Sequence, residues 1–586
     1  MELIKMKING RDVEVPKTAT ILEACRQEGI DIPTLCYMRN INAIGACRIC
    51  VVEVKGARTL VASCVYPVAE GMEVTTHSAQ VVQARKTTLE LILSNHRMEC
   101  LTCLRNQNCE LQKLAHDFGI QEVRFQSDKK EPEIENSSTH LVRDNSKCIL
   151  CRRCVAVCKQ NQSVSVIGPN DRGFDTHISC AFDRNLDEVP CVSCGQCITV
   201  CPTGALTEKD HTEEVWKALG DPTKHVVVGT APSIRVTLGE CFDMPIGTNV
   251  EGKMVAALRR LGFDGVFDVD VTADLTIMEE GTEFVKRLTE GGTLPMITSC
   301  SPGWIRFAEQ YFPDFIPNLS TCKSPQQMFG AMMKTYYAKK MNLDPKDIIT
   351  VSIMPCTAKK FEIRRPNEQA VPGLYDIDIA LTTRELSRMI SMSGLRFKDL
   401  PDEEFDPAFG ISTGASVIFG ATGGVMEAAL RTVVKLVTGE ESESIDFTDV
   451  RGVAGVKEAT YNVGGTAVKV AAVSGLSNAR RLLEDVRAGK TDYHFIEIMC
   501  CPGGCVNGGG QPLQPPTVRN FEDLRALRAK AIYQQDKNMP LRRSHENPLI
   551  QTLYKELLGE PGGHKAHEWL HTSYAEQPKY RTEAKQ

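Results

Sequence analysis

Two identically spaced runs of cysteine constrain this chain more than any other feature. The runs are Cys148, Cys151, Cys154 and Cys158, and then Cys191, Cys194, Cys197 and Cys201, which Pro202 follows. In two-cluster bacterial ferredoxins this spacing binds two [4Fe–4S] clusters, and the fourth cysteine of each run ligates the other cluster. We therefore expect a ferredoxin-like domain over residues 139–210, with Cys158 completing the second site and Cys201 the first.

The chain contains 24 cysteines in all. Its first residues, MELIKMKING, lack the basic segment and long apolar stretch of a secretory signal, so we expect a cytoplasmic protein. Because the cytosol keeps thiols reduced, the cysteines indicate metal ligation rather than disulfides. The net charge of −6 and the lack of any run of eighteen apolar residues argue against nucleic acid and membranes as partners.

The N-terminal residues 1–78 favour a small β-grasp domain. Two alternating segments, ELIKMKI and DVEV, flank Asn9-Gly10, and the helical stretch TILEACRQEGI follows. One close pair and two distant cysteines come next: Cys36, Cys47, Cys50 and Cys64. Structural zinc sites usually combine two close pairs, so we favour a [2Fe–2S] cluster over zinc. The segment resembles the [2Fe–2S] domain shared by hydrogenases and the large iron–sulfur subunit of respiratory NADH dehydrogenase.

Residues 79–118 are expected to hold one [4Fe–4S] cluster. A predicted helix, Gln80 to Leu93, precedes the candidate ligands His96, Cys100, Cys103 and Cys109. A lone histidine is usually a surface residue, but three cysteines leave one iron of a cubane without a ligand. The set resembles the one-histidine, three-cysteine module of the same two families. The polar segment Gln126–Ser138 has the composition of a linker.

From Lys224 onward the pattern predicts α/β layers with buried parallel strands. Strand-like segments such as HVVVGTAPS, FDGVFDVD and DIITVSIMPC alternate with helical ones such as MVAALRRLG and GTEFVKRLTE. Ligand sites of parallel sheets lie at the carboxyl ends of the strands, where TSCSPGW (298–304) and MPCTAKKFE (354–362) fall. We place this domain at 224–514. The tail 515–586 is predicted to be helical, and its histidines (His545, His564, His567, His571) to be surface or packing residues.

Three motifs, TSCSPGW, MPCTAKKFE and IMCCPGGCVNGGG (498–510), resemble the sequence blocks of the [FeFe]-hydrogenase catalytic domain. In the tail, RRSHENP and HKAHEWLH resemble the small-subunit segment of those enzymes. The resemblance implies an H-cluster, which is a [4Fe–4S] cubane joined through a cysteine to a two-iron unit carrying CO, CN− and a bridging dithiolate amine. It also implies reversible, heterolytic cleavage of H2, with H2 and protons as reactants.

The resemblance further assigns residues to this cofactor. Cys356, Cys501 and Cys505 are expected to ligate the cubane, with Cys505 bridging to the two-iron unit. Lys359 is expected to hold one cyanide and Ser233 the other. Met354 and Met499 are expected to pack around the two-iron unit, although both also suit an ordinary core.

Proton transfer is expected to follow the family's relay, which maps onto Glu280, Ser320 and Glu283, with Arg287 near the exit. Apart from the motifs, the acidic residues of MEEGTEF would be interpreted as the start of a helix, where negative charge suits the helix dipole.

The chain departs from the family pattern at one position. The usual block has two adjacent cysteines, the first relaying protons and the second ligating the cubane, whereas here Ser301 follows Cys300. Thiolate is the better iron ligand, so we expect Cys300 to ligate after a small shift of the loop and Ser301 or water to relay. Two alternatives for the cubane ligand stay open: an alkoxide from Ser301, or a contribution from the additional Cys500.

The arrangement resembles the catalytic subunit of the multi-subunit NADP-reducing hydrogenase. That resemblance implies a hetero-oligomer with flavin- and NAD(P)-binding and iron–sulfur partner subunits. A monomeric ferredoxin-linked hydrogenase has the same modules. Two non-hydrogenase alternatives are an iron–sulfur assembly protein without the two-iron unit and an electron-relay subunit. The alternative of an electron-relay subunit is supported only by the first 210 residues.

Overall fold

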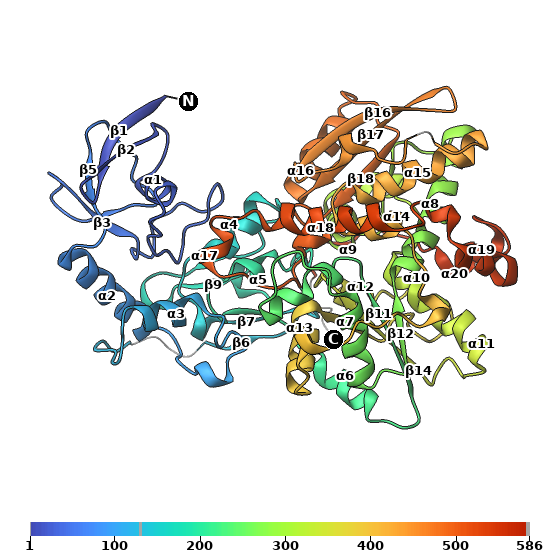
Figure 1. Cartoon of the computed structure of the whole chain (residues 1–586), viewed down its shortest axis with the longest axis horizontal. Helices are drawn as coiled ribbons and strands as arrows, with labels where there is room; N and C mark the ends of the chain where they lie inside the picture. The colour runs from blue at the N-terminus through green and yellow to red at the C-terminus, as the bar shows by residue number, and fades with distance from the viewer. Residues whose placement is uncertain (1, 128–131, 443, 582–586) are drawn as a thin grey trace.

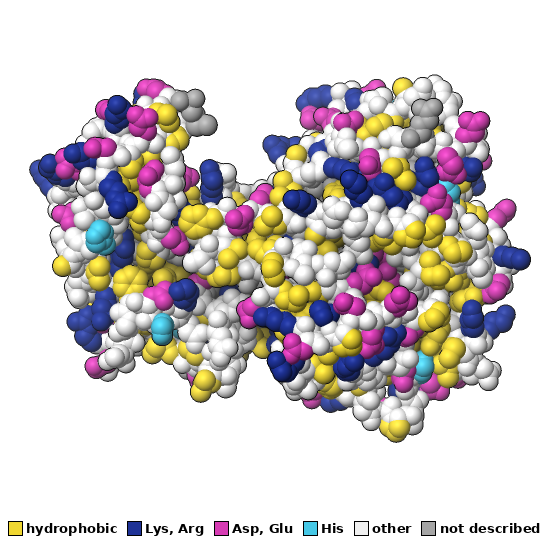
Figure 2. Space-filling model, in the orientation of Figure 1, with side chains coloured by type: hydrophobic (Ala, Val, Ile, Leu, Met, Phe, Trp, Pro, Cys, Tyr) yellow, Lys and Arg dark blue, Asp and Glu magenta, His cyan; other side chains and the backbone are white. Residues whose placement is uncertain are grey.

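The computed structural model describes residues 2–127, 132–442 and 444–581. A small N-terminal arm projects from a larger body, and the ferredoxin-like segment joins the two (Figure 1). On the face shown in Figure 2 a hollow separates arm from body, and basic and acidic side chains are interspersed over both. Among the described residues, no helix combines the length and the apolar character needed to cross a membrane.

The arm contains the predicted β-grasp fold. Strands β1 (Leu3–Ile8) and β2 (Arg11–Pro16) form the expected antiparallel hairpin. They join β5 (Glu73–Thr75), β3 (Val51–Val54) and β4 (Val61–Ala62) in one sheet with the order β2-β1-β5-β3-β4. Helix α1 (Ile21–Gln27) begins with a capping box from Thr20 and Glu23, and α2 (Ala79–Ser94) and α3 (Glu110–Asp117) follow.

The ferredoxin-like segment forms a small sheet, β10 (Leu206–Glu208), β7 (Leu141–Asp144) and β6 (Ile134–Glu135), beside α4 (Arg153–Gln160) and α5 (Gln196–Val200). Strand β6 lies inside the segment Gln126–Ser138, which was expected to be a linker. It forms a strand because its backbone pairs with the neighbouring β7. The linker prediction is therefore wrong for this strand, and residues 128–131 lie outside the described residues.

The body is built on two buried sheets. The first is wholly parallel, in the order β12 (Gly265–Asp268), β11 (His225–Thr230), β14 (Ile348–Met354) and β15 (Ile379–Thr382). The second has the order β13 (Met296–Ile297), β18 (Phe495–Met499), β17 (Thr466–Ser474) and β16 (Val456–Val463), of which only β16 is antiparallel to its neighbour. This confirms the predicted α/β domain with parallel strands.

Helices position the functional segments around these sheets. The longest, α8 (Asp270–Glu290), packs against α10 (Pro325–Met332) and α15 (Gly424–Thr438). The tail is helical as predicted, with α17 (Pro516–Arg519), α18 (Leu524–Asn538), α19 (Pro548–Leu553) and α20 (His564–Leu570). It is anchored by a buried cation: Arg431 on α15 bonds Asp536 on α18 at 2.8 Å and Glu427 at 2.7 Å.

Candidate functional site

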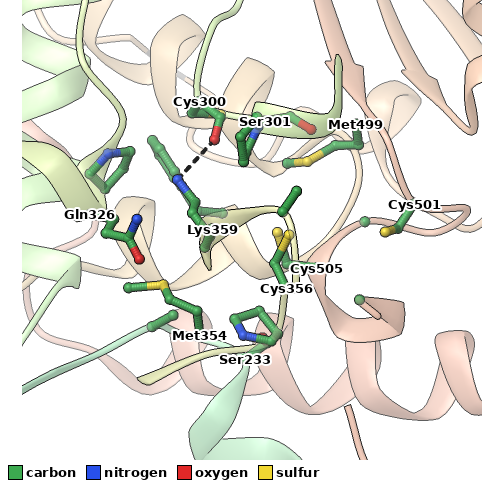
Figure 3. Close-up of a pocket in the computed structure, with 18 of the residues that line it drawn as sticks. Ser233, Cys300, Ser301, Gln326, Met354, Cys356, Lys359, Met499, Cys501 and Cys505 are labelled. Atoms are coloured by element: carbon green, nitrogen blue, oxygen red, sulfur yellow. Dashed lines mark hydrogen bonds between the residues drawn. The ribbon is translucent and has the colours of Figure 1, made fainter. Parts of the chain in front are cut away.

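The candidate site is a cavity where both sheets of the body present the carboxyl ends of their strands (Figure 3). Strand β14 ends at Met354 just before Cys356, and β18 ends at Met499 before Cys501. The turn after β11 carries Ser233 into the same wall. Parallel strands bring residues from distant motifs together at this edge, so all three sequence blocks meet in one place.

Thiols dominate the chemistry of the cavity wall. Cys300, Cys356, Cys501 and Cys505 all line it, and Figure 3 shows Cys356, Cys505 and Lys359 pointing into the same space. Burial, with the neighbouring Cys501, raises the pKa of Cys505 to about 12 and that of Cys356 above its usual range. A thiolate is therefore unfavourable here without a cation to compensate it, and iron supplies that compensation. The donor set fits a cubane.

Lys359 is the cationic group of the cavity. It begins the short helix α12 (Lys359–Glu362), and its Nζ donates to Ser324 Oγ and Glu362 Oε2, both at 2.8 Å, and to the Cys300 carbonyl at 3.3 Å. These partners hold a nearly buried ammonium at the wall, where a cationic donor attracts an anionic ligand strongly. The positive charge of Lys359 therefore suits a cofactor that carries anionic cyanide ligands.

The other expected contacts also reach the cavity. Ser233 Oγ accepts a hydrogen bond from Gln511 Nε2 at 3.1 Å. Met354 and Met499, each 3 % exposed, line the wall and also belong to the core, and their packing around a two-iron unit stays a prediction. Gly504, at φ +94°, brings the backbone before Cys505 into a conformation that L-residues rarely adopt.

The expected relay residues lie near one another beside the cavity, and hydrogen bonds join Ser320, Glu283 and Arg287 but not the carboxyl oxygens of Glu280. Glu280 is 1 % exposed, and burial, reinforced by the charge of Glu283, raises its pKa to about 8. Glu283 accepts a hydrogen bond from Ser320 Oγ at 3.0 Å and pairs with Arg287 at 2.6 Å. Burial, followed by the nearby charge of Glu280, raises the pKa of the Cys300 thiol well above its usual range.

The interpretation of MEEGTEF as an acidic helix start is wrong. Helix α8 begins at Asp270, so Glu280 lies in the middle of the helix, far from the dipole charge at its N-terminus. Its side chain is buried in the interior. Glu279 and Glu280 point in different directions, because successive residues of an α-helix are about 100° apart around its axis. Glu279 accordingly faces the tail, where it accepts hydrogen bonds from His571 Nε2 at 3.0 Å and from the Tyr554 hydroxyl.

His571 is thus a buried packing residue, 9 % exposed, and not a surface one. Its Nδ1 also bonds Thr321 Oγ1 at 2.7 Å, directly beside the relay. Sequence reasoning missed this contact, because it joins residues 250 and 292 positions apart through the docking of the tail.

The cysteine runs of the ferredoxin-like segment meet in two cavities. One is lined by Cys148, Cys151, Cys154 and Cys201, and the other by Cys158, Cys191, Cys194 and Cys197. The last cysteine of each run therefore lies with the other run, in the arrangement that the spacing predicts.

The N-terminal candidates also gather. The thiol of Cys36 hydrogen-bonds those of Cys47 and Cys64, and Cys64 also contacts Cys50. His96 directly follows α2, and Cys100 and Cys103 bound the short turn after it. Cys103 packs on Gly204 of the ferredoxin-like segment, where an added Cβ would lie 2.5 Å from its sulfur.

The second ferredoxin-like cavity adjoins the catalytic one. Cys194 lines both, which sequence spacing alone could not reveal. Across this joint Thr357 Oγ1 donates to the Ser193 carbonyl at 2.8 Å, Arg306 Nη1 donates to Ser193 Oγ at 2.7 Å, and Gln196 Nε2 donates to the Asn507 carbonyl at 2.8 Å.

Comparisons with known proteins agree with this geometry. Residues 224–509 match the iron only hydrogenase large subunit, C-terminal domain, and residues 522–577 match the iron hydrogenase small subunit. Residues 2–79 match a 2Fe-2S iron-sulfur cluster binding domain, residues 85–124 match the NADH-ubiquinone oxidoreductase-G iron-sulfur binding region, and residues 147–205 match a 4Fe-4S dicluster domain.

Whole-chain relatives extend the match. The NADP-reducing hydrogenase subunit HndD of Solidesulfovibrio fructosivorans is 48% identical over 98% of this chain and 99% of its own length. Iron hydrogenase 1 of Clostridium pasteurianum is 43% identical over 97% and 99%. A solved structure of a variant of [FeFe]-hydrogenase HydA1 from Chlamydomonas reinhardtii is 42% identical, with TM-score 0.56, over 63% of this chain and 99% of that one. Full-length identity at this level, with every domain matched in order, means that the chain belongs to the iron-only, or [FeFe], hydrogenases.

Proposed function

We propose that this chain is the catalytic subunit of a cytoplasmic, multi-subunit hydrogenase that exchanges electrons between H2 and NADP or NAD through a separate flavin-containing subunit. The observation that carries the proposal is the thiol-lined cavity with Lys359 at its wall, joined through Cys194 to a chain of cluster sites. A relative named as a subunit of an NADP-reducing hydrogenase matches the full length of the chain, and this supports NADP over other acceptors.

In this proposal Cys356, Cys501 and Cys505 hold the cubane of the H-cluster, and Lys359 and Ser233 bind its cyanide ligands. When bound, the H-cluster supplies the metal centre and the bridging base at which H2 is cleaved heterolytically. The apolar remainder of the wall, which includes Met354 and Met499, keeps water away from the centre. Exclusion of water strengthens the attraction between the Lys359 ammonium and an anionic ligand.

Protons leave along the line of Cys300, Glu280, Ser320 and Glu283. Glu280 suits a relay because its raised pKa, about 8, allows it to hold or release a proton near neutral pH. The Ser320 hydroxyl bonds Glu283 at 3.0 Å and can pass a proton outward to it. Arg287 pairs with Glu283 at the outer end of the line.

Electrons leave in the opposite direction. We assign Cys158, Cys191, Cys194 and Cys197 to the cluster nearest the cavity, and Cys148, Cys151, Cys154 and Cys201 to the next. His96, Cys100, Cys103 and Cys109 then hold the third [4Fe–4S] cluster. Cys36, Cys47, Cys50 and Cys64 hold a [2Fe–2S] cluster in the arm, where a partner subunit can reach it.

Two measurements test the function. Matured protein should reduce viologen with H2 and show infrared bands of bound CO and CN−, and a lack of both would refute hydrogenase activity. Affinity purification from the native cell should recover a flavin subunit and H2-dependent NADP or NAD reduction. A ferredoxin-linked monomeric hydrogenase has the same modules and is the second candidate, and iron hydrogenase 1, whose name mentions no subunit, matches nearly the full chain as well. Purification of an active single chain that reduces ferredoxin but no nicotinamide would favour it.

A further inference from the structure

We propose that Cys500 supplies the fourth thiolate of the H-cluster cubane, beside Cys356, Cys501 and Cys505, and that Cys300 stays free for proton transfer. This inference rests on the proposed function. It reassigns the ligand role that the sequence alone favours for Cys300.

The first argument is that positions 301 and 500 are neighbours on the same wall. The Cys500 amide donates to Ser301 Oγ at 3.1 Å, and both residues line the cavity. A thiol carried by residue 500 therefore starts from nearly the place where the family pattern puts a thiol at residue 301. Compared with the family pattern, this chain has serine at position 301 and carries a thiol at the adjoining position 500.

The second argument is that space is made for this sulfur. Cys500 is 5 % exposed, and an added Cβ at Gly303 would lie only 2.6 Å from its Sγ. Glycine at position 303 leaves room for the Cys500 sulfur in its present position. There the Cys500 thiol donates to Gln162 Oε1 at 3.8 Å, and Cys501, one of the three expected ligands, follows it in the chain and lines the same cavity. A rotation about the Cα–Cβ bond, between staggered positions, would turn the Cys500 thiol towards the cubane site.

Ser301 and Cys300 are poorer candidates. The Ser301 hydroxyl is already an acceptor for the Cys500 amide, and an alkoxide is a far weaker match to iron than a thiolate. Cys300 lies among the charged groups of the relay, Glu280 and Lys359, and its carbonyl accepts from Lys359 Nζ. That position suits a proton carrier between the cavity and Glu280.

The proposal also has a consequence for electron flow. The Cys500 thiol contacts the thiol of Cys194, which belongs to the nearest ferredoxin-like site. Ligation by Cys500 would place ligands of two clusters next to each other at the joint.

The test counts iron in the full chain produced without maturation, so that the cubane is present but the two-iron unit is not. Cys500→Ala should lose about four iron atoms per chain, with matching sulfide, and one [4Fe–4S] signal in the EPR spectrum of the reduced protein. The double variant Ser301→Cys/Cys500→Ala should restore both. Cys300→Ala, and Cys322→Ala as a buried thiol outside the cavity, should keep the wild-type iron content.

The remaining clusters report on folding, because a misfolded variant would lose them too. If Cys500→Ala misfolds, recovery of full iron in the double variant still supports the proposal, and failure to recover overturns it. A full iron content in Cys500→Ala, or loss of about four irons in Cys300→Ala instead, also overturns it. None of these readouts requires H2 turnover, so failure here is distinct from failure of the proposed function.

Discussion

Replacing Glu280 by glutamine should block turnover while leaving the cofactor in place. The change keeps the shape of the side chain and removes its ability to exchange a proton. A positioned acid–base group contributes about 10²- to 10⁴-fold to rate, and Glu280 is a buried carboxyl near Cys300 of the cavity wall. We therefore expect H2-dependent viologen reduction to fall by about two orders of magnitude or more.

The pKa of Glu280 adds a pH dependence to this prediction. Burial raises that pKa to about 8, so the carboxyl stays protonated in the folded protein at neutral pH and ionises only as the pH passes about 8. In the direction of H2 evolution, proton delivery towards the cavity should therefore weaken above about pH 8, as the protonated form disappears, and H2 production from reduced viologen across this pH range measures it. The Glu280→Gln variant should retain little activity, and its rate should show no further decline above about pH 8.

Glu279→Gln is the matched control, because it makes the same change one residue away. Glu279 is equally buried but bonds the tail through Tyr554 and His571. It should keep near-wild-type turnover. Infrared bands and iron content should match wild type in both variants. If Glu280→Gln retained more than about a tenth of the wild-type rate with an intact cofactor, Glu280 would not lie on the path.

Three further changes test other parts of the structure. Lys359→Met should lose the CO and CN− bands on maturation while iron per chain in unmatured protein stays unchanged, because only the anchor for the two-iron unit is removed; intact bands would exclude that role. Cys505→Ser should lose both the bands and H2 turnover, and full turnover would refute the bridging assignment. Arg431→Met removes the cation shared by Glu427 and Asp536 and leaves them to Arg451 and Arg542 alone. The loss should stay below the about 3–5 kcal/mol of a fully unpaired buried charge, and the half-life in thermal inactivation should shorten.

The sequence predicts the cluster sites well because ligand spacing is a local property. The runs from Cys148 and Cys191 define two sites, and even the exchange of Cys158 and Cys201 follows from known geometry. The β-grasp hairpin and α2 likewise follow from short-range periodicity. Their strands and helices begin within a residue or two of the predicted positions.

Features that depend on packing could not be predicted in this way. The depth of Glu280 follows from α8 starting at Asp270, immediately after a strand that ends at Asp268. Tail docking brings His571 to Glu279, and strand pairing orders β6 within a segment of linker-like composition. Each outcome depends on the packing of one element against another, which intrinsic propensity does not encode.

The hydrogen bonds between Ser193, Arg306 and Thr357 have a mechanical meaning for the whole enzyme. A domain held by such bonds, with Gln196 bonded to Asn507 as well, cannot act as a swinging carrier that detaches and delivers charge elsewhere. Every electron crosses the same fixed gap there. In the proposed electron path, the distance between the catalytic cavity and the nearest cluster site is therefore constant.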